Sequence, residues 1–130
     1  MELADISHRM IFQSKVDLII ASEWNSDINY FSNIVESLSR DLHCYVAQVN
    51  NSIYGDSRLT QPSATAAKDL IKLKGGLNSI ILVGEINPKT LRDFQMKKYS
   101  LTRTDPMFKP VPPSINREAV RRRQNGKLQF

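Results

Sequence analysis

The chain has 130 residues, of which 41% are hydrophobic and 24% are charged, which is ordinary for one soluble globular domain. Its single cysteine excludes a disulfide within the chain, and the longest apolar runs are far too short to cross a bilayer. The N-terminus carries charges of both signs and no apolar signal region, so we expect a cytoplasmic protein without membrane contact.

The net charge of +5 is unevenly distributed along the chain. Residues 96–130 hold nine Lys or Arg and two Asp or Glu, whereas residues 1–95 have a balance of −2. Four of the six prolines also lie in the later segment. We therefore expect a folded body over residues 1–95 and a Pro-containing basic tail over residues 96–130.

The first half of the body predicts two helices around one strand. SHRMIFQSK, with Ser7 as its cap, favours a brief helix over residues 7–15. VDLIIAS is rich in branched side chains and favours a strand over residues 16–22 that is buried on both faces. Apolar side chains then recur at helical spacing, which predicts a helix capped by Ser26 or Asp27. Its apolar face consists of Ile28, Phe31, Ile34, Val35 and Leu38.

The second half of the body predicts strands joined by short turns. CYVAQVN alternates between two sets of side chains and predicts a strand over residues 44–50. Three further strands are expected over residues 58–61, 69–74 and 79–86. A helix is expected to begin at Pro88 and to end near residue 98. After residue 99 the chain is expected to run extended, with one or two helical turns over residues 118–124. This order of strands and helices predicts a layered α/β fold.

An ordered set of short segments resembles the C-terminal half of the carbon–nitrogen hydrolase (nitrilase) superfamily. The matching segments are residues 2–3, 16–22, 28–38, 45–50, 54–62, 69–74, 80–87 and 91–94. The resemblance implies a partial nitrilase-like α-β-β-α sandwich, its C-terminal half, with an extended basic tail. SEWN, DLHCYVAQVN, YGDSR and FKPVPP are similar, more particularly, to nitrilase-like domains fused behind bacterial defence reverse transcriptases.

The family's chemistry uses a Cys nucleophile, a Glu general base and a Lys that stabilises the tetrahedral intermediate. The resemblance places all three outside this chain, with the nucleophile one position before the residue aligned with Met1. It therefore implies a truncated or degenerate hydrolase-like domain, inactive alone and without a cofactor, that supplies the back half of a site. The expected partner is a second copy of the chain or a missing N-terminal half.

Two polar loops are expected near the cleft of a complete family member. One follows the first strand, where layered α/β folds place ligand loops, and the other is the turn after the second strand. The pocket-lining candidates in these loops are Ser22, Glu23, Trp24, Asn25, Tyr54 and Ser57. In the alternative interpretation Trp24 covers the edge of the core, Asn25 caps the next helix, and the second loop is a plain turn.

Cys44 has two interpretations, a nucleophile activated by His43 or a small buried side chain. Adjacent residues of a strand point to opposite faces, so His43 is poorly placed to reach the Cys44 sulfur. Free cysteine is also among the most buried residue types. We therefore predict a structural thiol and no catalytic residue in this chain. The spacing of His8 and His43 matches no zinc site, so no metal ligand is predicted either.

The basic tail indicates a second class of function. Its cations are expected to contact nucleic-acid phosphates through a salt-dependent attraction that does not distinguish sequence. The candidate residues are Arg117, Arg121, Arg122, Arg123 and Lys127. The alternatives are a solvated tail, or a tail that packs on the missing half or on another subunit.

Overall fold

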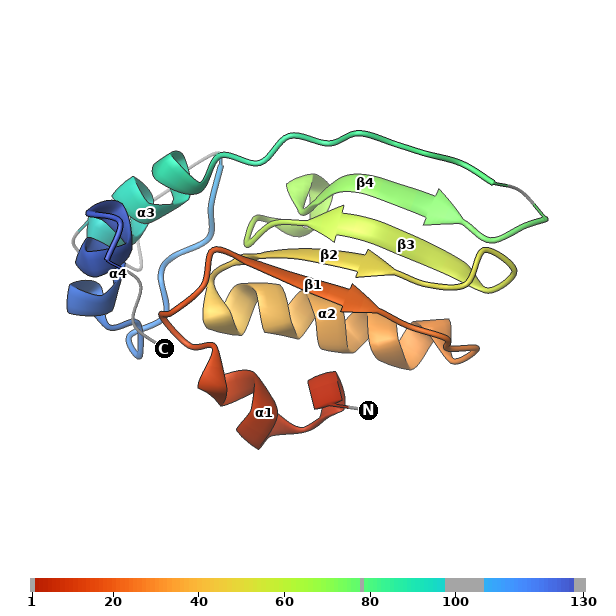
Figure 1. Cartoon of the computed structure of the whole chain (residues 1–130), viewed down its shortest axis with the longest axis horizontal. Coiled ribbons are helices and arrows are strands. Elements are labelled where there is room, and N and C mark those ends of the chain that lie inside the picture. The colour runs from red at the N-terminus through yellow and green to blue at the C-terminus, as the bar shows by residue number, and fades with distance from the viewer. Residues whose placement is uncertain (1, 78, 98–106, 128–130) are drawn as a thin grey trace.

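The computed structural model describes residues 2–77, 79–97 and 107–127 and has a mixed α/β fold. Its sheet has four strands, β1 (Leu18–Ser22), β2 (Tyr45–Val49), β3 (Gly55–Thr60) and β4 (Asp69–Lys74), in that spatial order (Figure 1). β1 and β2 are parallel, and β2, β3 and β4 are antiparallel neighbours. The α/β class expected from the sequence is confirmed.

The helix α2 (Ile28–Leu42) connects the two parallel strands and covers one face of the sheet (Figure 1). The Asp27 side chain caps its N-terminus by accepting a hydrogen bond from the Tyr30 amide, as the sequence predicted. The helix ends at His43, which adopts the left-handed conformation with φ of 53°. This conformation reverses the chain directly into β2, so the crossover needs no long loop.

The main core lies between α2 and the sheet. Its buried members are Ile19, Val35, Leu38, Leu42, Cys44 and Val46. The helical period places one stripe of α2 against the strands, and the period of two in β1 and β2 places alternate side chains against α2. The sequence-predicted apolar face of the helix is therefore buried from Ile34 onward, whereas Ile28 at its start is partly exposed.

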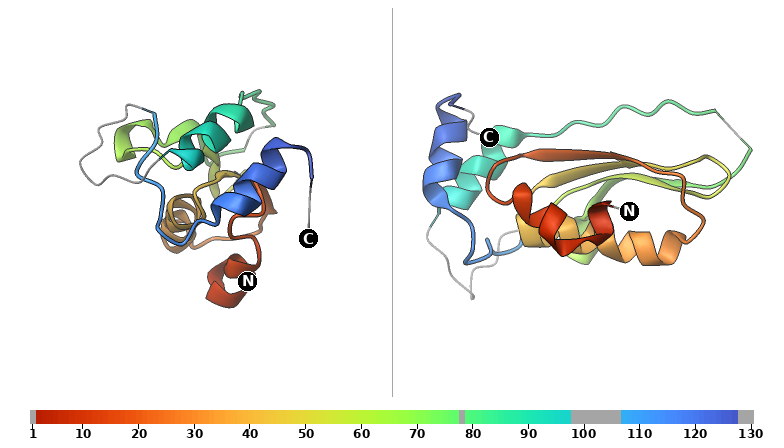
Figure 2. Two further views of the ribbon diagram at one scale, coloured as in Figure 1. Left: turned by 90° about the vertical axis from the view of Figure 1, so that its left-hand side faces the viewer. Right: turned by 60° about the horizontal axis from the view of Figure 1, so that its bottom comes forward.

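The helices α3 (Pro88–Met96) and α4 (Arg117–Gln124) pack on each other at one end of the sheet (Figure 2). Pro88 and the Asn87 cap open α3, as expected. The second apolar cluster lies beneath α3 and joins Tyr45, Leu91, Phe94 and Phe108. Burial of Phe108 and of Val120 in α4 anchors this part of the C-terminal segment on the body.

The helical turns predicted over residues 118–124 are observed as α4. Residues 107–116 form no helix or strand, as expected, but they do not lie only at the surface because Phe108 and Ile115 are buried. Residues 99–106 lie outside the described residues.

The N-terminal region contains a 3-10 turn, η1 (Glu2–Ala4), and the helix α1 (Ile6–Ile11), which lies against α2. Asp5 rather than Ser7 caps α1, because the Asp5 carboxylate accepts hydrogen bonds from the amides of Ser7 and His8. A second 3-10 turn, η2 (Thr65–Ala67), connects β3 to β4. No helix among the described residues is long and apolar enough to span a membrane.

Two expectations about strands are wrong. β1 is not buried on both faces: Ile19 is buried, but the next side chain, Ile20, is 73% exposed because no element covers the sheet there. Residues 79–86 form no strand, although the apolar sequence favours one. They run extended past β4 in the opposite direction and pair with none of the described strands (Figure 1).

Candidate functional site

A polar junction joins the ends of β1 and β2 to the start of β3. Asn50, which is almost fully buried, forms its centre. Its Oδ1 accepts hydrogen bonds from the amides of Asn25 and Asn51 at 2.9 and 2.8 Å. Its Nδ2 donates to the carbonyls of Asn25 and Gly55, both at 2.9 Å. The side chain is fully satisfied, so its role is to hold three chain segments together.

Two of the sequence-predicted pocket residues lie beside this junction. Ser57 accepts a hydrogen bond from the Asn50 amide at 2.9 Å. Glu23 accepts one from the side-chain amide of Gln48 at 3.0 Å, and its other oxygen is buried without a hydrogen-bonding partner among the described residues. Burial raises the pKa of Glu23, and the nearby Asp56 carboxylate raises it further. The edge of the sheet thus presents a carboxyl group that is easier to protonate than usual.

A network of charged side chains lies between α2 and β3–β4. The Arg58 side chain is fully buried and pairs with Asp56, and it lies 3.6 Å from Glu36 and 3.7 Å from Asp69. Lys68 pairs with Glu36 as well. Asp56 itself adopts a left-handed conformation, with φ of 65°, which is unfavourable for a residue with a Cβ. The surrounding ion pairs hold it there.

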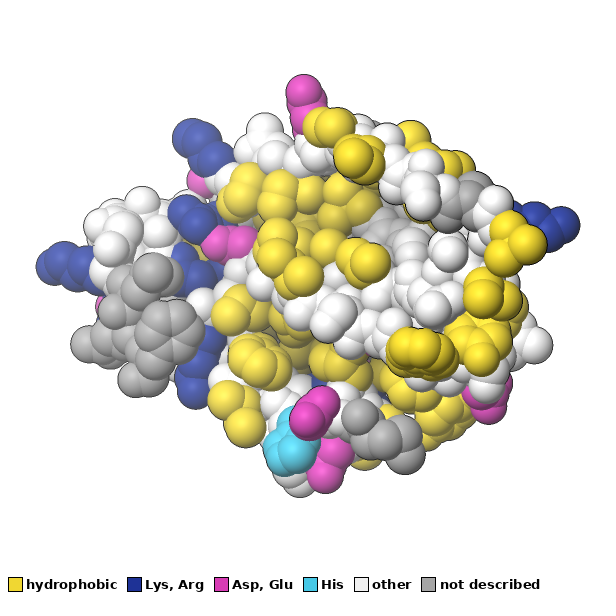
Figure 3. Space-filling model, turned by 45° about the vertical axis from the view of Figure 1, so that its right-hand side comes forward, with side chains coloured by type: hydrophobic (Ala, Val, Ile, Leu, Met, Phe, Trp, Pro, Cys, Tyr) yellow, Lys and Arg dark blue, Asp and Glu magenta, His cyan; other side chains and the backbone are white. Residues whose placement is uncertain are grey.

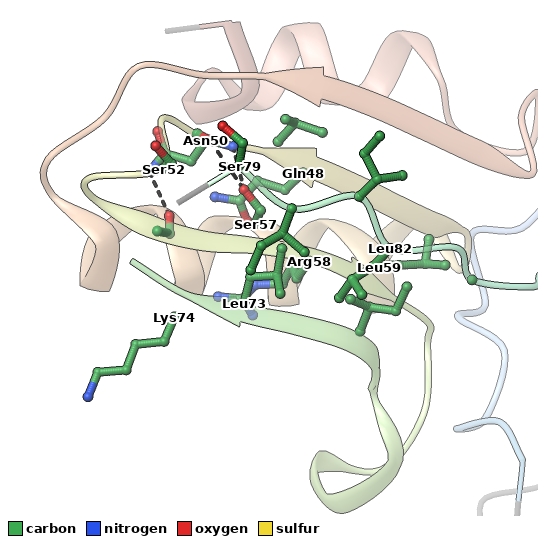
Figure 4. Close-up of a pocket in the computed structure, with 16 residues that line it drawn as sticks. Gln48, Asn50, Ser52, Ser57, Arg58, Leu59, Leu73, Lys74, Ser79 and Leu82 are labelled. Atoms are coloured by element: carbon green, nitrogen blue, oxygen red, sulfur yellow. Dashed lines mark hydrogen bonds between the residues drawn. The ribbon is translucent and has the colours of Figure 1, made fainter. Parts of the chain in front are cut away.

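The sheet face opposite α2 is hollowed rather than covered. A pocket of about 730 Å³ lies between this face and residues 79–84 (Figure 4). Its apolar wall contains Leu59, Ile71, Leu73, Ile80 and Leu82, and its polar end contains Asn50, Ser52, Ser57 and Ser79. Many hydrophobic side chains gather at the surface shown in Figure 3. This open face and the polar junction at its edge are the candidate functional site.

The structure separates the predicted pocket residues into three groups. Ser57 lines the pocket, and Glu23 and Asn25 contact residues that line it. Ser22 and Trp24 lie at the surface and line neither pocket, and Trp24 is 81% exposed. Tyr54 lines a second hollow of about 620 Å³ near the start of α2.

Sequence reasoning missed the residues that organise this site. Gln48 and Asn50 both lie in the strand predicted over residues 44–50, and their polar side chains in this otherwise apolar stretch are the available signal. Arg58 begins the strand predicted over residues 58–61, and nothing local in the sequence indicates that its side chain is buried. Its burial depends on acidic side chains from α2 and β4, whose proximity follows from the sheet order.

Cys44 is fully buried, and burial raises the pKa of its thiol to about 12. The His43 imidazole stacks on the Phe94 ring and donates from Nε2 to the Lys109 carbonyl at 3.0 Å. Burial lowers the pKa of His43. A protonated thiol in the core and a neutral imidazole engaged elsewhere cannot form a nucleophile–base pair at neutral pH. Among the described residues, no cluster of three His, Cys, Asp or Glu side chains is suited to hold a metal.

The cations of the C-terminal segment are not equivalent. Arg123 is buried and pairs with Asp17, and burial lowers the pKa of its guanidinium. It also donates to Gln95 and to the Val16 carbonyl. Arg123 is therefore unavailable to nucleic-acid phosphates, contrary to the sequence-based expectation.

The remaining tail candidates lie at the surface. Arg121 and Arg122 pair with Glu118 on the same helix, and Arg117 donates to the Lys97 carbonyl. These three residues and Lys127 are exposed. Phosphate contact by these four side chains stays a prediction.

No family model, curated protein or solved structure matches this chain.

Proposed function

We propose that this chain is half of a carbon–nitrogen hydrolase-like α-β-β-α sandwich, which supplies the back of a site and has no catalytic activity alone. The observation that carries the proposal is the open sheet face. A sandwich of this kind has two helix layers outside and two sheets packed face to face inside. Among the described residues, α2 covers one face of the sheet, and no second sheet packs on the other face.

The chemistry of the open face supports this assignment. Ile20 is 73% exposed and Val49 is 56% exposed, although both lie in strands. Their neighbours across the sheet are also apolar and include Leu59 and Ile71, which are half-buried beneath residues 79–84. Sheets packed in a sandwich bury side chains of this kind between them at a spacing of about 10 Å. A monomer in water gains nothing from exposing them, so a partner layer is the simplest explanation of the pattern.

The absence of a usable nucleophile supports the second part of the proposal. The only thiol is buried with a raised pKa. Glu23 has a raised pKa and borders the open face, but no hydroxyl or thiol beside it is positioned as a nucleophile–base pair among the described contacts. In a complete sandwich this edge would contribute positioning groups, such as Glu23 and the Asn50 junction, to a site whose reactive residues come from the second sheet.

The first experiment measures ammonia release from a panel of simple amides and nitriles. We expect no turnover by the chain alone, and no difference between the wild type and Cys44→Ala. Turnover that disappears in Cys44→Ala or in Glu23→Gln would show that the chain is an enzyme by itself and would overturn the proposal.

The second experiment tests the open face directly. A hydrophobic dye that fluoresces on apolar surfaces should bind the wild type, and Ile20→Lys together with Val49→Lys should weaken this binding without lowering the melting temperature. The matched control is Ile6→Lys on α1, which is also exposed but lies away from the sheet face. Equal dye binding by all three proteins would contradict an open sheet face.

Nucleic-acid contact through α4 is a second candidate function. It is favoured by the exposure of Arg117, Arg121, Arg122 and Lys127 on one short segment. A role within a reverse-transcriptase-associated defence system would provide such a ligand. Fluorescence anisotropy with generic RNA and DNA should then show binding that weakens steeply with salt. Arg121→Ala with Lys127→Ala should reduce the binding and its salt slope, and binding that survives this double substitution would argue against α4.

A further inference from the structure

His43 lies at the junction between α2 and β2, and neither proposed function uses its side chain. The residue adopts the left-handed conformation, with φ of 53°, which glycine usually takes at a helix end. Its imidazole is nevertheless fully buried. Whether a buried imidazole can accept a second proton depends on what its two ring nitrogens meet, because both carry a proton in the charged form.

The imidazole lies where the body meets the C-terminal part of the chain. It stacks on the Phe94 ring of α3, with ring centres 5.7 Å apart and planes at 6°, and the centre of the Phe108 ring lies 6.2 Å away. The Nε2 atom donates to the Lys109 carbonyl at 3.0 Å. Nε2 therefore carries the proton of the neutral ring, and Nδ1 is left as an acceptor.

The Nδ1 atom faces a donor that is not easily exchanged for an acceptor. The Gln95 amide nitrogen lies 3.4 Å from Nδ1 and donates to the His43 carbonyl at 2.7 Å. The oxygen of the same amide accepts a hydrogen bond from Arg123 at 3.0 Å. Turning the amide to present its oxygen to Nδ1 would break both of these bonds. A second ring proton would therefore meet an N–H group, and a buried donor without an acceptor is costly.

The titratable groups on the surrounding elements do not compensate for a positive charge on the ring. They are Arg40 and Asp41 at the end of α2, Cys44 and Tyr45 at the start of β2, Asp17 before β1, Lys97 after α3, Lys109, and Arg123 on α4. The two α2 residues are exposed, and burial raises the pKa of both β2 residues, so these two are neutral. The Asp17 carboxylate is already paired with Arg92 and Arg123. An imidazolium would therefore join a group of cations without gaining an unpaired, buried carboxylate among them.

We propose that His43 is a pH-sensitive contact, which holds residues 107–127 on the body while its imidazole is neutral and releases them when the imidazole is protonated. Burial lowers the pKa of His43 below its usual 6.5, and the two backbone carbonyls near the ring offset this only in part. After release, water reaches the ring, and the imidazole takes up a proton more readily. The stability of docking is therefore fully present above pH 6.5 and is lost as the pH falls from there toward the lower pKa of docked His43.

Release of residues 107–127 removes each obstacle to the charged ring. Departure of Phe108 and Lys109 admits water, which hydrates the imidazolium. Departure of Arg123 frees the Gln95 oxygen, which can then turn toward Nδ1 and accept a hydrogen bond. The core between α2 and the sheet includes none of residues 107–127, so the sheet does not have to unfold.

The test is nuclear magnetic resonance of the full chain from about pH 7.5 to about pH 5, the range in which histidine titrates. Ring signals of His43 report its protonation, and backbone heteronuclear Overhauser effects report the order of residues 107–127. We expect this segment to become mobile as His43 is protonated, while α2 stays ordered. Because one proton is taken up on release, the docking equilibrium constant should fall by up to about tenfold per pH unit.

Three variants identify the group that responds to pH. Gln95→Glu places a carboxylate opposite Nδ1 and keeps an acceptor for Arg123, so the segment should stay docked at acidic pH. Asparagine tolerates the left-handed conformation and takes up no proton, so in His43→Asn docking should be weaker but independent of pH. His8→Asn changes the other histidine, which is exposed on α1, and should behave like the wild type.

Two results would overturn the proposal. One is a wild-type segment that remains ordered at about pH 5, and the other is a release that keeps its pH dependence in His43→Asn. If His43→Asn is undocked even at neutral pH, Gln95→Glu decides the question. Release of Gln95→Glu at the same pH as the wild type would then show that protonation of His43 does not control docking.

Discussion

The two faces of the sheet differ both in what covers them and in what they bury. The face beneath α2 holds apolar packing around Leu38 and Val46 at one end and the Arg58 ion-pair network at the other. The opposite face carries apolar side chains such as Ile20 and Val49, and solvent reaches them. Charges are therefore buried on one face while hydrophobic side chains are exposed on the other.

This contrast reverses the usual partition of side chains between core and surface. The covered face is complete, since its carboxylates and cations neutralise each other within one chain. The open face is covered only in part, by residues 79–84 over Leu59 and Ile71, and the described residues leave Ile20 and Val49 exposed. Because hydrophobic burial drives association as well as folding, the covered face accounts for the stability of the monomer, and the open face is where the proposed second layer would pack. Substitutions on the two faces should separate these roles.

The largest effect is expected for Arg58→Ala on the covered face. This change leaves the buried Asp56 carboxylate without its paired cation. It also removes the positive charge that lies near Glu36 and Asp69. Breaking a buried ion pair from one side costs about 3–5 kcal/mol, which urea denaturation would measure as a loss of unfolding free energy. The matched control is Arg121→Ala, whose ion pair with Glu118 is exposed and should change stability little. Equal effects in the two variants would show that the buried network does not stabilise the covered face.

A somewhat smaller effect is expected for Leu38→Ala. This side chain is fully buried against the sheet, and truncation of a buried leucine costs about 2–5 kcal/mol. Ile20→Ala, on the other face of the same sheet, should leave the unfolding free energy of the monomer nearly unchanged because Ile20 is mostly exposed. A similar loss in both variants would mean that the open face is packed in solution, and the comparison of the two faces would fail.

The sequence predicted the elements whose signals are local. The apolar spacing of α2 and its Asp27 cap lie within one segment, and Pro88 marks the start of α3 in the same way. The strand over residues 79–86 was predicted from equally clear local signals but is absent. A strand requires a hydrogen-bonding partner, and the sequence does not say whether the partner belongs to the same chain.

The candidate site was less predictable because its contacts join distant parts of the chain. Glu23 and Ser57 were found from their loops, but the Asn50 junction that holds the loops appears only when β1, β2 and β3 are placed together. Arg123 looked like its neighbours in a run of three arginines. Its partner Asp17 lies more than a hundred residues earlier, and only the packing of α4 beside β1 distinguishes a buried cation from two exposed ones.

The Cys44 thiol predicts an effect confined to alkaline pH. Its pKa rises from 9.0 in the unfolded chain to about 12 in the folded protein, so the folded state retains the proton longer. The resulting stability is fully present below pH 9 and is lost as the pH rises from 9 toward 12. Cys44→Ala should abolish this part of the pH dependence in thermal melts, and a thiol reagent should modify native wild type slowly at neutral pH. Rapid modification would show that the thiol is not enclosed by the covered face.

The smallest effect is expected for Glu23→Gln at the border between the two faces. Burial raises the pKa of Glu23 above its usual 4.5, so the folded state favours the protonated acid. The stability that this provides is present below pH 4.5 and is lost as the pH rises through the folded pKa. At neutral pH the ionised Glu23 side chain therefore destabilises the folded state modestly. The uncharged amide of Glu23→Gln should raise the melting temperature slightly while keeping an acceptor for Gln48. Near pH 4 the two proteins should melt together. If Glu23→Gln is instead less stable than the wild type at neutral pH, the Glu23 carboxylate is stabilised by the Arg58 ion-pair network. The electrostatic effect of that network would then reach from the covered face to the edge of the open face.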